Sequence, residues 1–271
     1  MLLQRIITAL ILAPLAVLGV LFLPAPAMAV VAALIFLLGF DEWMMLSGVN
    51  GRAQRVLAVI ALAAALAALY LHLKPWFAPA LLIIGTGWWL LVLLWLRNIT
   101  YAAAPTPENS ARKLFAGLLT VVPAWAAMLW LHGHTRYGIW LLIALLIVWG
   151  ADIGAYFAGT RFGRHKLAPR ISPGKTREGV YGALGLSLLV ALVAGVLLKL
   201  AWPTLIGLLC VTLVAVLASI IGDLLESLLK RHAMVKDSGT LFPGHGGLFD
   251  RLDSVCAFLP VFALGLWVLG L

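Results

Sequence analysis

Apolar and polar residues alternate along the chain in long blocks. Because about 20 mostly apolar residues are needed to cross roughly 30 Å of hydrocarbon, each long apolar block predicts a transmembrane helix. Nine such blocks are present, each bounded by charged residues or by Pro and Gly. Their approximate cores are Ile6 to Leu23, Met28 to Phe40, Val56 to Leu73, Ala80 to Leu96, Leu114 to Leu131, Tyr137 to Ala158, Gly179 to Leu200, Thr204 to Gly222 and Val255 to Leu271.

The second block is shorter than a full span, and only Pro24 to Ala27 separates it from the first. A tight helical hairpin or a partly re-entrant segment would explain both features, so the pattern fits eight spans as well as nine. The first block also resembles a secretory signal, because Arg5 precedes it and Ala27-Met28-Ala29 follows it. A retained first helix is the plainer interpretation, since the rest of the chain is polytopic.

The composition supports a membrane protein. Hydrophobic residues make up 64% of the 271 residues and charged residues 11%, whereas soluble domains contain roughly 45–50% and about 25%. We therefore predict an all-α, polytopic fold with about nine transmembrane segments. No polar stretch is long enough to bury a core of its own, so residues 1–271 form one predicted domain, with N-terminal spans in 1–131 and a loop-bearing half in 137–271. Cys210 and Cys256 lie inside apolar blocks and suggest neither a disulfide framework nor a metal site.

The charged residues predict the orientation. Successive loops of a polytopic protein lie on alternate sides of the membrane. All of the 19 Lys and Arg residues except Lys74, Arg136 and Lys199 fall on one of these two sides, and so do all ten acids. The basic excess marks the cytoplasmic side, so we expect a cytoplasmic N-terminus and a polar site that faces the cytoplasm. This topology explains the net charge of +9 without nucleic acid as a partner. The absence of a convincing inverted repeat weakens a secondary-transporter interpretation.

The first polar segment that stands out runs from Asp152 to Gly179. Asp152 lies near the end of the sixth span, where an acid is costly unless it faces water, a metal or a cation. Further on, the sequence Ser172-Pro173-Gly174-Lys175-Thr176 offers a hydroxyl, a flexible backbone and an ammonium group, which suit a phosphate. It is not a Walker A motif, because the glycine spacing differs and no strand is predicted before it. The alternatives are a buried ion pair at Asp152 and ordinary loop basicity.

The second such segment runs from Gly222 to Asp253. If the eighth helix continues into the cytoplasm, Asp223, Glu226, Ser227 and Lys230 share one face. An amphipathic helix at the membrane surface is the plainer alternative. A Gly- and Pro-rich turn follows, and Asp250 and Asp253 then share a face at the start of the ninth span.

Acidic and basic residues interleave in these two segments, and this combination indicates which ligands they could bind. Carboxylates from separate helix ends, without a cluster of Cys or His, favour hard cations such as Mg²⁺. The interleaved Lys and Arg would repel the metal unless a polyanion lay between them. The pattern therefore indicates phosphoryl or nucleotidyl transfer. His245 is a candidate base or phosphate donor, or a structural residue of the turn.

The second segment resembles the signature of the phosphatidate cytidylyltransferases, also called CDP-diacylglycerol synthases. The resemblance extends to the Ser172–Thr176 motif with Glu178 and Gly179, and to Asp152 with Gly154. The N-terminal spans carry no residues diagnostic of this family. The matching signature positions are Ser227, Lys230, Arg231, Lys236, Asp237, Gly239, Pro243, His245, Gly246, Gly247, Asp250, Arg251 and Asp253.

The resemblance implies a reaction and roles for these residues. CTP and phosphatidic acid would give CDP-diacylglycerol and diphosphate with Mg²⁺ as cofactor, at the cytoplasmic face of a bacterial inner membrane. A homodimer is also suggested. Asp223 and Asp250 are the first-choice metal ligands, with Asp152, Asp237 and Asp253 as further ligands or orienting groups. The expected phosphate-binding and pocket residues are Lys175, Arg177, Lys230, Arg231, Lys236, Arg251, Ser172, Ser227, His245, Gly246 and Gly247.

Three alternatives compete with this interpretation. A related membrane enzyme, such as a polyprenol kinase or an archaeal-lipid cytidylyltransferase, shares the reaction type but uses another lipid. A transporter of cations or organic anions places its site near the membrane midplane, whereas these acids lie at the ends of spans. A non-catalytic scaffold would keep all of its activity after Asp250→Asn.

Overall fold

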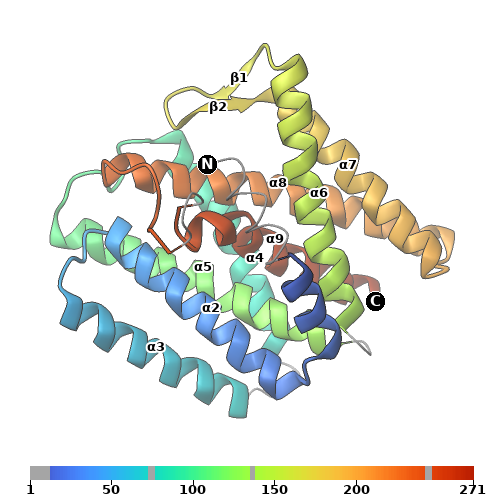
Figure 1. Cartoon of the computed structure of the whole chain (residues 1–271), viewed down its shortest axis with the longest axis horizontal. Coiled ribbons are helices and arrows are strands. Elements are labelled where there is room, and N and C mark those ends of the chain that lie inside the picture. Colours follow the sequence, from blue (N-terminus) through green and yellow to red (C-terminus); the bar gives the residue numbers. More distant parts are fainter. Residues whose placement is uncertain (1–12, 73–76, 135–137, 242–245) are drawn as a thin grey trace.

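The chain folds into a bundle of long helices, as the apolar blocks predict (Figure 1). The computed structural model describes residues 13–72, 77–134, 138–241 and 246–271. Among these residues, eight helices are long and apolar enough to cross a membrane, which confirms the polytopic helical fold. They are α2 (Ala25–Leu46), α3 (Arg52–His72), α4 (Phe77–Arg97), α5 (Pro107–Gly133), α6 (Ile139–Phe162), α7 (Arg177–Leu197), α8 (Trp202–His232) and α9 (Phe249–Leu269).

The first two predicted spans differ from expectation. The first is described from residue 13 on, where it forms the shorter apolar helix Ala13–Phe22. The sequence predicts a short second span, but α2 is helical over 22 residues and continues through Asp41 and Glu42. The second span is therefore long enough to cross a membrane, and its shortness no longer calls for a re-entrant segment. The helix accommodates both acids because Asp41 pairs with Arg55 of α3 at 3.5 Å and Glu42 finds partners in a distant loop.

The segment between α6 and α7 contains a small β-hairpin that the all-α prediction missed. β1 (Lys166–Ala168) pairs antiparallel with β2 (Ser172–Thr176), and Lys166 lies opposite Thr176. The phosphate-type motif of the sequence is thus a strand. Strands of three and five residues, one of them containing Pro173, show no alternating pattern by which the sequence could predict them.

Polar contacts tie this hairpin to the start of α7. Thr176 is the N-cap of α7, and its hydroxyl accepts a hydrogen bond from the backbone N–H of Gly179 at 3.1 Å. The carboxylate of Glu178 contacts Nδ1 of His165 at 2.6 Å and accepts from its backbone N–H. The backbone N–H of Arg177 also donates to the carbonyl of His165 at 2.9 Å. The backbone directly after Lys175 is therefore held in place.

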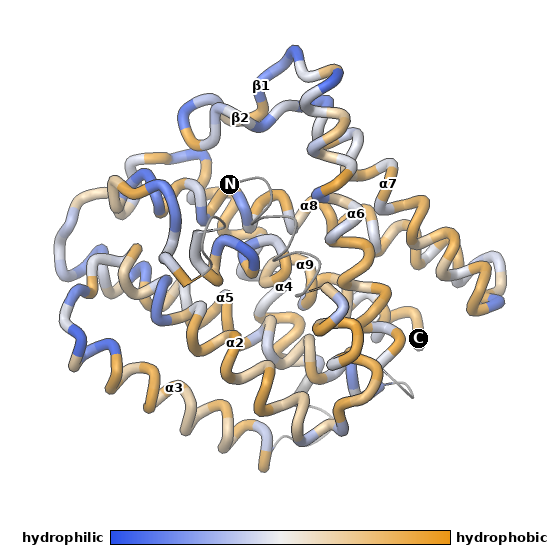
Figure 2. Tube along the Cα trace, viewed as in Figure 1, coloured by the Kyte–Doolittle hydropathy of each residue, from blue (hydrophilic) through white to orange (hydrophobic). Residues whose placement is uncertain are grey.

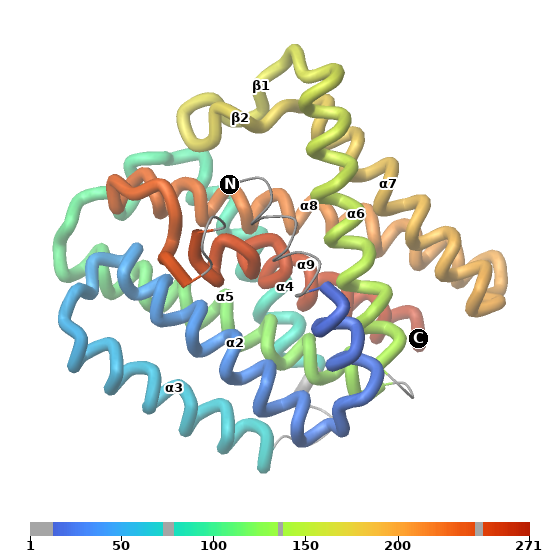
Figure 3. Tube along the Cα trace, viewed as in Figure 1, coloured from blue at the N-terminus to red at the C-terminus, as the bar shows by residue number. Residues whose placement is uncertain are grey.

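α9 lies at the centre of the bundle, and most of its residues are buried. It packs against α8, α5, α4, α2 and α6 (Figure 1). Figure 3 shows that segments far apart in the sequence lie together: α2, from the N-terminal part of the chain, packs against α9, from the C-terminal part. α3, in contrast, packs mainly against α2 and is largely exposed. The start of α9, which carries Asp250 in its first turn and Asp253 just after it, is therefore positioned from several directions.

Glycines allow two helix pairs to approach closely. Gly154 of α6 faces Gly182 of α7, and a Cβ atom on either would collide with the backbone oxygen of the other. A Cβ on Gly222 of α8 would lie 2.5 Å from the backbone oxygen of Asp253 and 2.8 Å from Cβ of Ala257, both in α9. Small residues at these positions permit the backbone contact, as in other membrane helix pairs.

The polar residues concentrate in the connections. Figure 2 shows helices that are apolar along most of their length, while the β-hairpin and the loops around α2, α3 and α5 are hydrophilic. The cytoplasmic orientation of these loops remains a prediction from the distribution of Lys and Arg.

Candidate functional site

A cavity of about 290 Å³ lies where the β-hairpin meets the ends of α6, α7 and α8. Small and apolar residues such as Ala155, Val180 and Ala183 form part of its wall. The polar and charged side chains that line it come from four elements. They are Asp152, Tyr156 and Thr160 of α6, Lys175 and Thr176 of β2, Ser219 and Asp223 of α8, and Ser254 of α9, with Gly179 of α7 beside them.

Three carboxylates gather where Asp223 lines this cavity. Asp223, Glu226 and Asp253 each offer an oxygen atom, and these atoms lie within 4.8 Å of one another. Glu226 and Asp253 are buried, and Asp223 is half-buried. Asp223 and Glu226 are one turn apart on α8. The close contact at Gly222 brings Asp253 of α9 next to them. We call Asp223, Glu226 and Asp253 the acid cluster.

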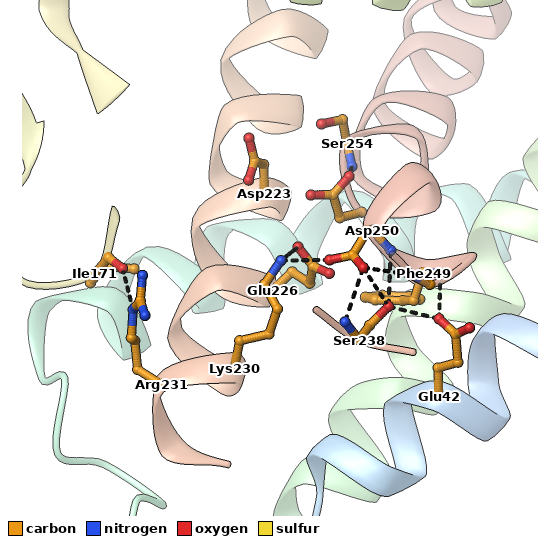
Figure 4. Close-up of polar contacts among 12 residues, drawn as sticks. Glu42, Ile171, Asp223, Glu226, Lys230, Arg231, Ser238, Phe249, Asp250 and Ser254 are labelled. Atoms are coloured by element: carbon orange, nitrogen blue, oxygen red, sulfur yellow. Dashed lines mark hydrogen bonds and ion pairs between the residues drawn. The ribbon is translucent and has the colours of Figure 1, made fainter. Parts of the chain in front are cut away.

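Two lysines offset the negative charge. Lys175 of β2 forms an ion pair with Asp223. Lys230 of α8 lies between two carboxylates, with its Nζ atom 2.8 Å from Glu226 and 2.6 Å from Asp250 (Figure 4). Because Glu226 is only 1% exposed, its charge depends on such a partner. The sequence predicts both lysines as site residues, and the structure places both beside the acids.

Asp250 lies beside the acid cluster, on the far side of Lys230. Its Oδ1 atom accepts from Lys230, while Oδ2 accepts from the backbone N–H groups of Ser238 at 2.9 Å and Gly247 at 2.8 Å. The hydroxyl of Ser238 lies 3.1 Å from the same Oδ2 atom. Asp250 thus organises the preceding loop, whereas the oxygen atoms of the acid cluster face one another. The pairing of Asp223 with Asp250 as joint metal ligands stays a prediction, and geometry groups Asp223 with Glu226 and Asp253.

The remaining predicted residues take different positions. Asp152 is exposed and lines the cavity wall. Arg231 is near the end of α8, where its Nε atom donates to the carbonyl of Ile171 at 3.2 Å and so connects α8 to the hairpin (Figure 4). Gly246 adopts a positive φ of 81°, which glycine tolerates best. Arg177, Lys236, Asp237 and Arg251 are exposed, Ser172 and Ser227 are half-buried, Gly247 is buried, and His245 lies outside the described residues.

Two acids at this site are absent from the predicted ligands. Glu226 is recognised in the sequence only as part of a polar helix face, although its spacing from Asp223 places both on that face. Glu42 is missed altogether, because the N-terminal spans show no family residues. Its side chain nevertheless reaches the loop before α9 and accepts hydrogen bonds there. The signal that could have found Glu42 is its position in a helix long and apolar enough to cross a membrane, because an acid there is costly without a partner.

Comparison with known proteins bears on the whole chain. The model of the cytidylyltransferase family matches residues 3–269. A phosphatidate cytidylyltransferase from Pseudomonas aeruginosa is 41% identical over 274 residues, which cover 100% of this chain and 98% of that relative. One from Haemophilus influenzae is 39% identical over 195 residues, or 68% and 67% of the two chains. One from Bacillus subtilis is 44% identical over 126 residues, or 46% of each. The match extends over nearly the full length and confirms the resemblance seen in the motifs: the chain belongs to the cytidylyltransferase family.

Proposed function

We propose that this protein is a phosphatidate cytidylyltransferase, which converts CTP and phosphatidic acid to CDP-diacylglycerol and diphosphate. The observation that carries the proposal is the acid cluster with its paired lysines beside a cavity at the ends of membrane-spanning helices. The names of full-length relatives support the same reaction. A site at the membrane boundary suits a reaction in which one substrate is soluble in water and the other is a lipid.

The reaction is an in-line displacement at phosphorus. A phosphate oxygen of phosphatidic acid forms a bond to the α-phosphorus of CTP, and the bond from that phosphorus to the bridging oxygen of the β-phosphate breaks. Diphosphate leaves with the electron pair. No side chain is required as a general base, because a phosphate monoester is largely ionised near neutral pH. The protein therefore contributes mainly by positioning the two polyanions and neutralising their charge.

The lysines and the hairpin suit the phosphate groups. Lys175 lines the cavity, and the N-cap of α7 lies directly after it. An ammonium group beside a helix N-terminus favours a bound anion, so we assign the triphosphate of CTP to this part of the cavity. Lys230 is less accessible, with 15% of its side chain exposed, and it orients Glu226 and Asp250.

The acid cluster fits Mg²⁺. Its donors are all carboxylate oxygens from two helices, which is the ligand type that a hard divalent cation prefers. Asp223, Glu226 and Asp253 would hold the ion, and Asp152, which also lines the cavity, is available as a further ligand. When bound, Mg²⁺ would neutralise charge on the phosphate oxygens of the substrates.

We also propose that the site faces the cytoplasm of a bacterium, with the protein in the inner membrane and its N-terminus inside. The distribution of Lys and Arg supports this orientation, and CTP is a cytoplasmic nucleotide. The homodimer that the family resemblance suggests is part of this proposal and is tested by chemical cross-linking in native membranes.

The first experiment measures CTP-dependent formation of CDP-diacylglycerol and diphosphate by purified protein in mixed micelles. Omission of phosphatidic acid and replacement of Mg²⁺ by EDTA are the two controls. We expect turnover only when both the lipid and Mg²⁺ are present. Turnover of CTP with a polyprenol alone would change the lipid substrate. No CTP turnover by folded protein in detergent would refute the proposal, because an enzyme needs no sealed compartment whereas a transporter does.

A further inference from the structure

Glu42 of α2 is a buried acid that the reaction itself does not use. Only 7% of its surface is exposed. Its Oε1 atom accepts the backbone N–H of Leu248 at 2.9 Å, and Oε2 accepts the backbone N–H of Phe249 at 2.7 Å. The hydroxyl of Ser238 donates to Oε2 at 2.7 Å (Figure 4). Three donors from one distant segment thus converge on this carboxylate.

The loop is shaped to receive the Glu42 side chain. A Cβ atom on Gly239 would collide with the Glu42 carboxylate, and so would a Cβ atom on Gly247. Next to Glu42, the indole of Trp43 packs edge-on against the ring of Phe249, with 5.1 Å between ring centroids. Contact between α2 and the start of α9 therefore combines a polar anchor with apolar packing.

This carboxylate supplies a cap that α9 lacks. The residue before α9, Leu248, has no side chain able to accept from the first turn, and no such hydrogen bond forms locally. The first N–H groups of a helix have no partner within the helix and carry partial positive charge. An anionic acceptor at this end satisfies two of them, so α2 caps α9 from outside.

The hydrogen bonds continue from Glu42 to the acid cluster. Ser238 contacts both Glu42 and Asp250 through its hydroxyl, which also accepts the backbone N–H of Asp250 at 3.2 Å. Asp250 in turn pairs with Lys230, and Lys230 pairs with Glu226. One connected network thus joins the second helix of the chain to carboxylates on α8 and α9 (Figure 4).

We propose that Glu42 is a positioning residue for nucleotidyl transfer, which sets the rotation and depth of the first turn of α9. It acts through Ser238 and the cap, and thereby places Asp250 and Asp253 relative to α8. Glu42 is not among the residues that line the described cavity, and its carboxylate is taken up by three donors from the protein. This inference rests on the proposed function.

The test is Glu42→Gln, which keeps the size of the side chain but removes its charge and one acceptor. We expect kcat to fall by at least about tenfold, as for the loss of a hydrogen bond to a charged group. The KM values for CTP and phosphatidic acid should stay within about twofold, because a positioning residue acts on the chemical step and not on substrate binding. The matched control is Asp41→Asn, which removes the adjacent carboxylate and its Arg55 pair from the same helix. Its kcat should stay within about twofold of the wild type.

Ser238→Ala provides a second test in case Glu42→Gln does not fold. It removes the hydroxyl that joins Glu42 to Asp250 but leaves both backbone hydrogen bonds of the cap. Folded Ser238→Ala protein with a reduced kcat supports the proposal. Where both single variants fold, the kcat of the double variant, Glu42→Gln with Ser238→Ala, should fall by less than the product of the two single effects. A folded Glu42→Gln protein with wild-type kcat overturns the proposal, as does wild-type kcat in Ser238→Ala when Glu42→Gln fails to fold. Absence of CTP turnover in the wild-type protein would instead show that the proposed function is wrong.

Discussion

Replacement of Gly222 by Ala inserts one methyl group between α8 and α9 at the level of the acid cluster. The new Cβ atom would lie 2.5 Å from the backbone oxygen of Asp253 and 2.8 Å from Cβ of Ala257. Neither atom belongs to a flexible side chain that can rotate away. The two helices must therefore move apart, and the acids on them move with them.

The size of this movement follows from the contact distances. Ordinary van der Waals contacts begin at 3.4 Å, so the oxygen of Asp253 has to retreat by about 0.9 Å. Overpacking of this kind costs about 1–3 kcal/mol of folding free energy. A misplacement of about 1 Å reduces the rate of a well-positioned reaction by on the order of 100-fold. Because Asp223 directly follows Gly222, we expect kcat of Gly222→Ala to fall about 100-fold while the protein still inserts and folds.

The assay is steady-state CDP-diacylglycerol formation in mixed micelles, together with thermal unfolding of the purified protein. Gly185→Ala in α7 is the matched control, because no atom lies within 4 Å of the Cβ position there. Alanine is the better helix former by up to about 1 kcal/mol, so this control should keep its kcat and its Tm. Wild-type kcat in folded Gly222→Ala would refute the reasoning. An equal loss in Gly185→Ala would also refute it, since that variant adds a methyl group without a collision.

Two further substitutions test the charged groups of the site. Asp223→Asn removes a carboxylate of the acid cluster, and we expect no measurable turnover with expression and gel-filtration behaviour near those of the wild type; full activity would contradict the metal assignment. Lys175→Ala should raise the apparent KM for CTP or phosphatidic acid in initial-rate measurements, as when a phosphate contact is lost. Loss of folded protein without a change in KM would instead give Lys175 a structural role.

Much of the fold follows from the sequence because the hydrophobic effect acts on local blocks. The eight long helices correspond to apolar runs that the chain shows directly. The end of α2 does not follow, because two successive acids, Asp41 and Glu42, normally mark the end of a span. Their partners are Arg55 of the next helix and a loop about 200 residues further on, as the sequence separation of 207 between Glu42 and Phe249 shows. No local pattern contains that information.

The candidate site is predictable in its parts but not in its arrangement. Helical spacing places Asp223 and Glu226 on one face and Asp250 and Asp253 on another. Which acid of α9 meets those of α8 depends on how the two helices are rotated against each other. The close contact at Gly222 decides this, and it brings Asp253 to the acid cluster while Asp250 turns towards Lys230.

The two lysines of the site do not balance the negative charge of its carboxylates. Four carboxylates, those of Asp223, Glu226, Asp250 and Asp253, lie beside two ammonium groups, those of Lys175 and Lys230. Within this set of six side chains, the carboxylates outnumber the ammonium groups by two. A buried carboxylate is stable when it is protonated or when its charge is offset, and the Mg²⁺ that we propose for the acid cluster would offset this charge. Under the proposed function, a triphosphate that binds with this cation would meet Lys175, which lines the cavity beside Asp223. We therefore expect the same residues to serve both the stability of the free protein and the binding of a metal-bound nucleotide.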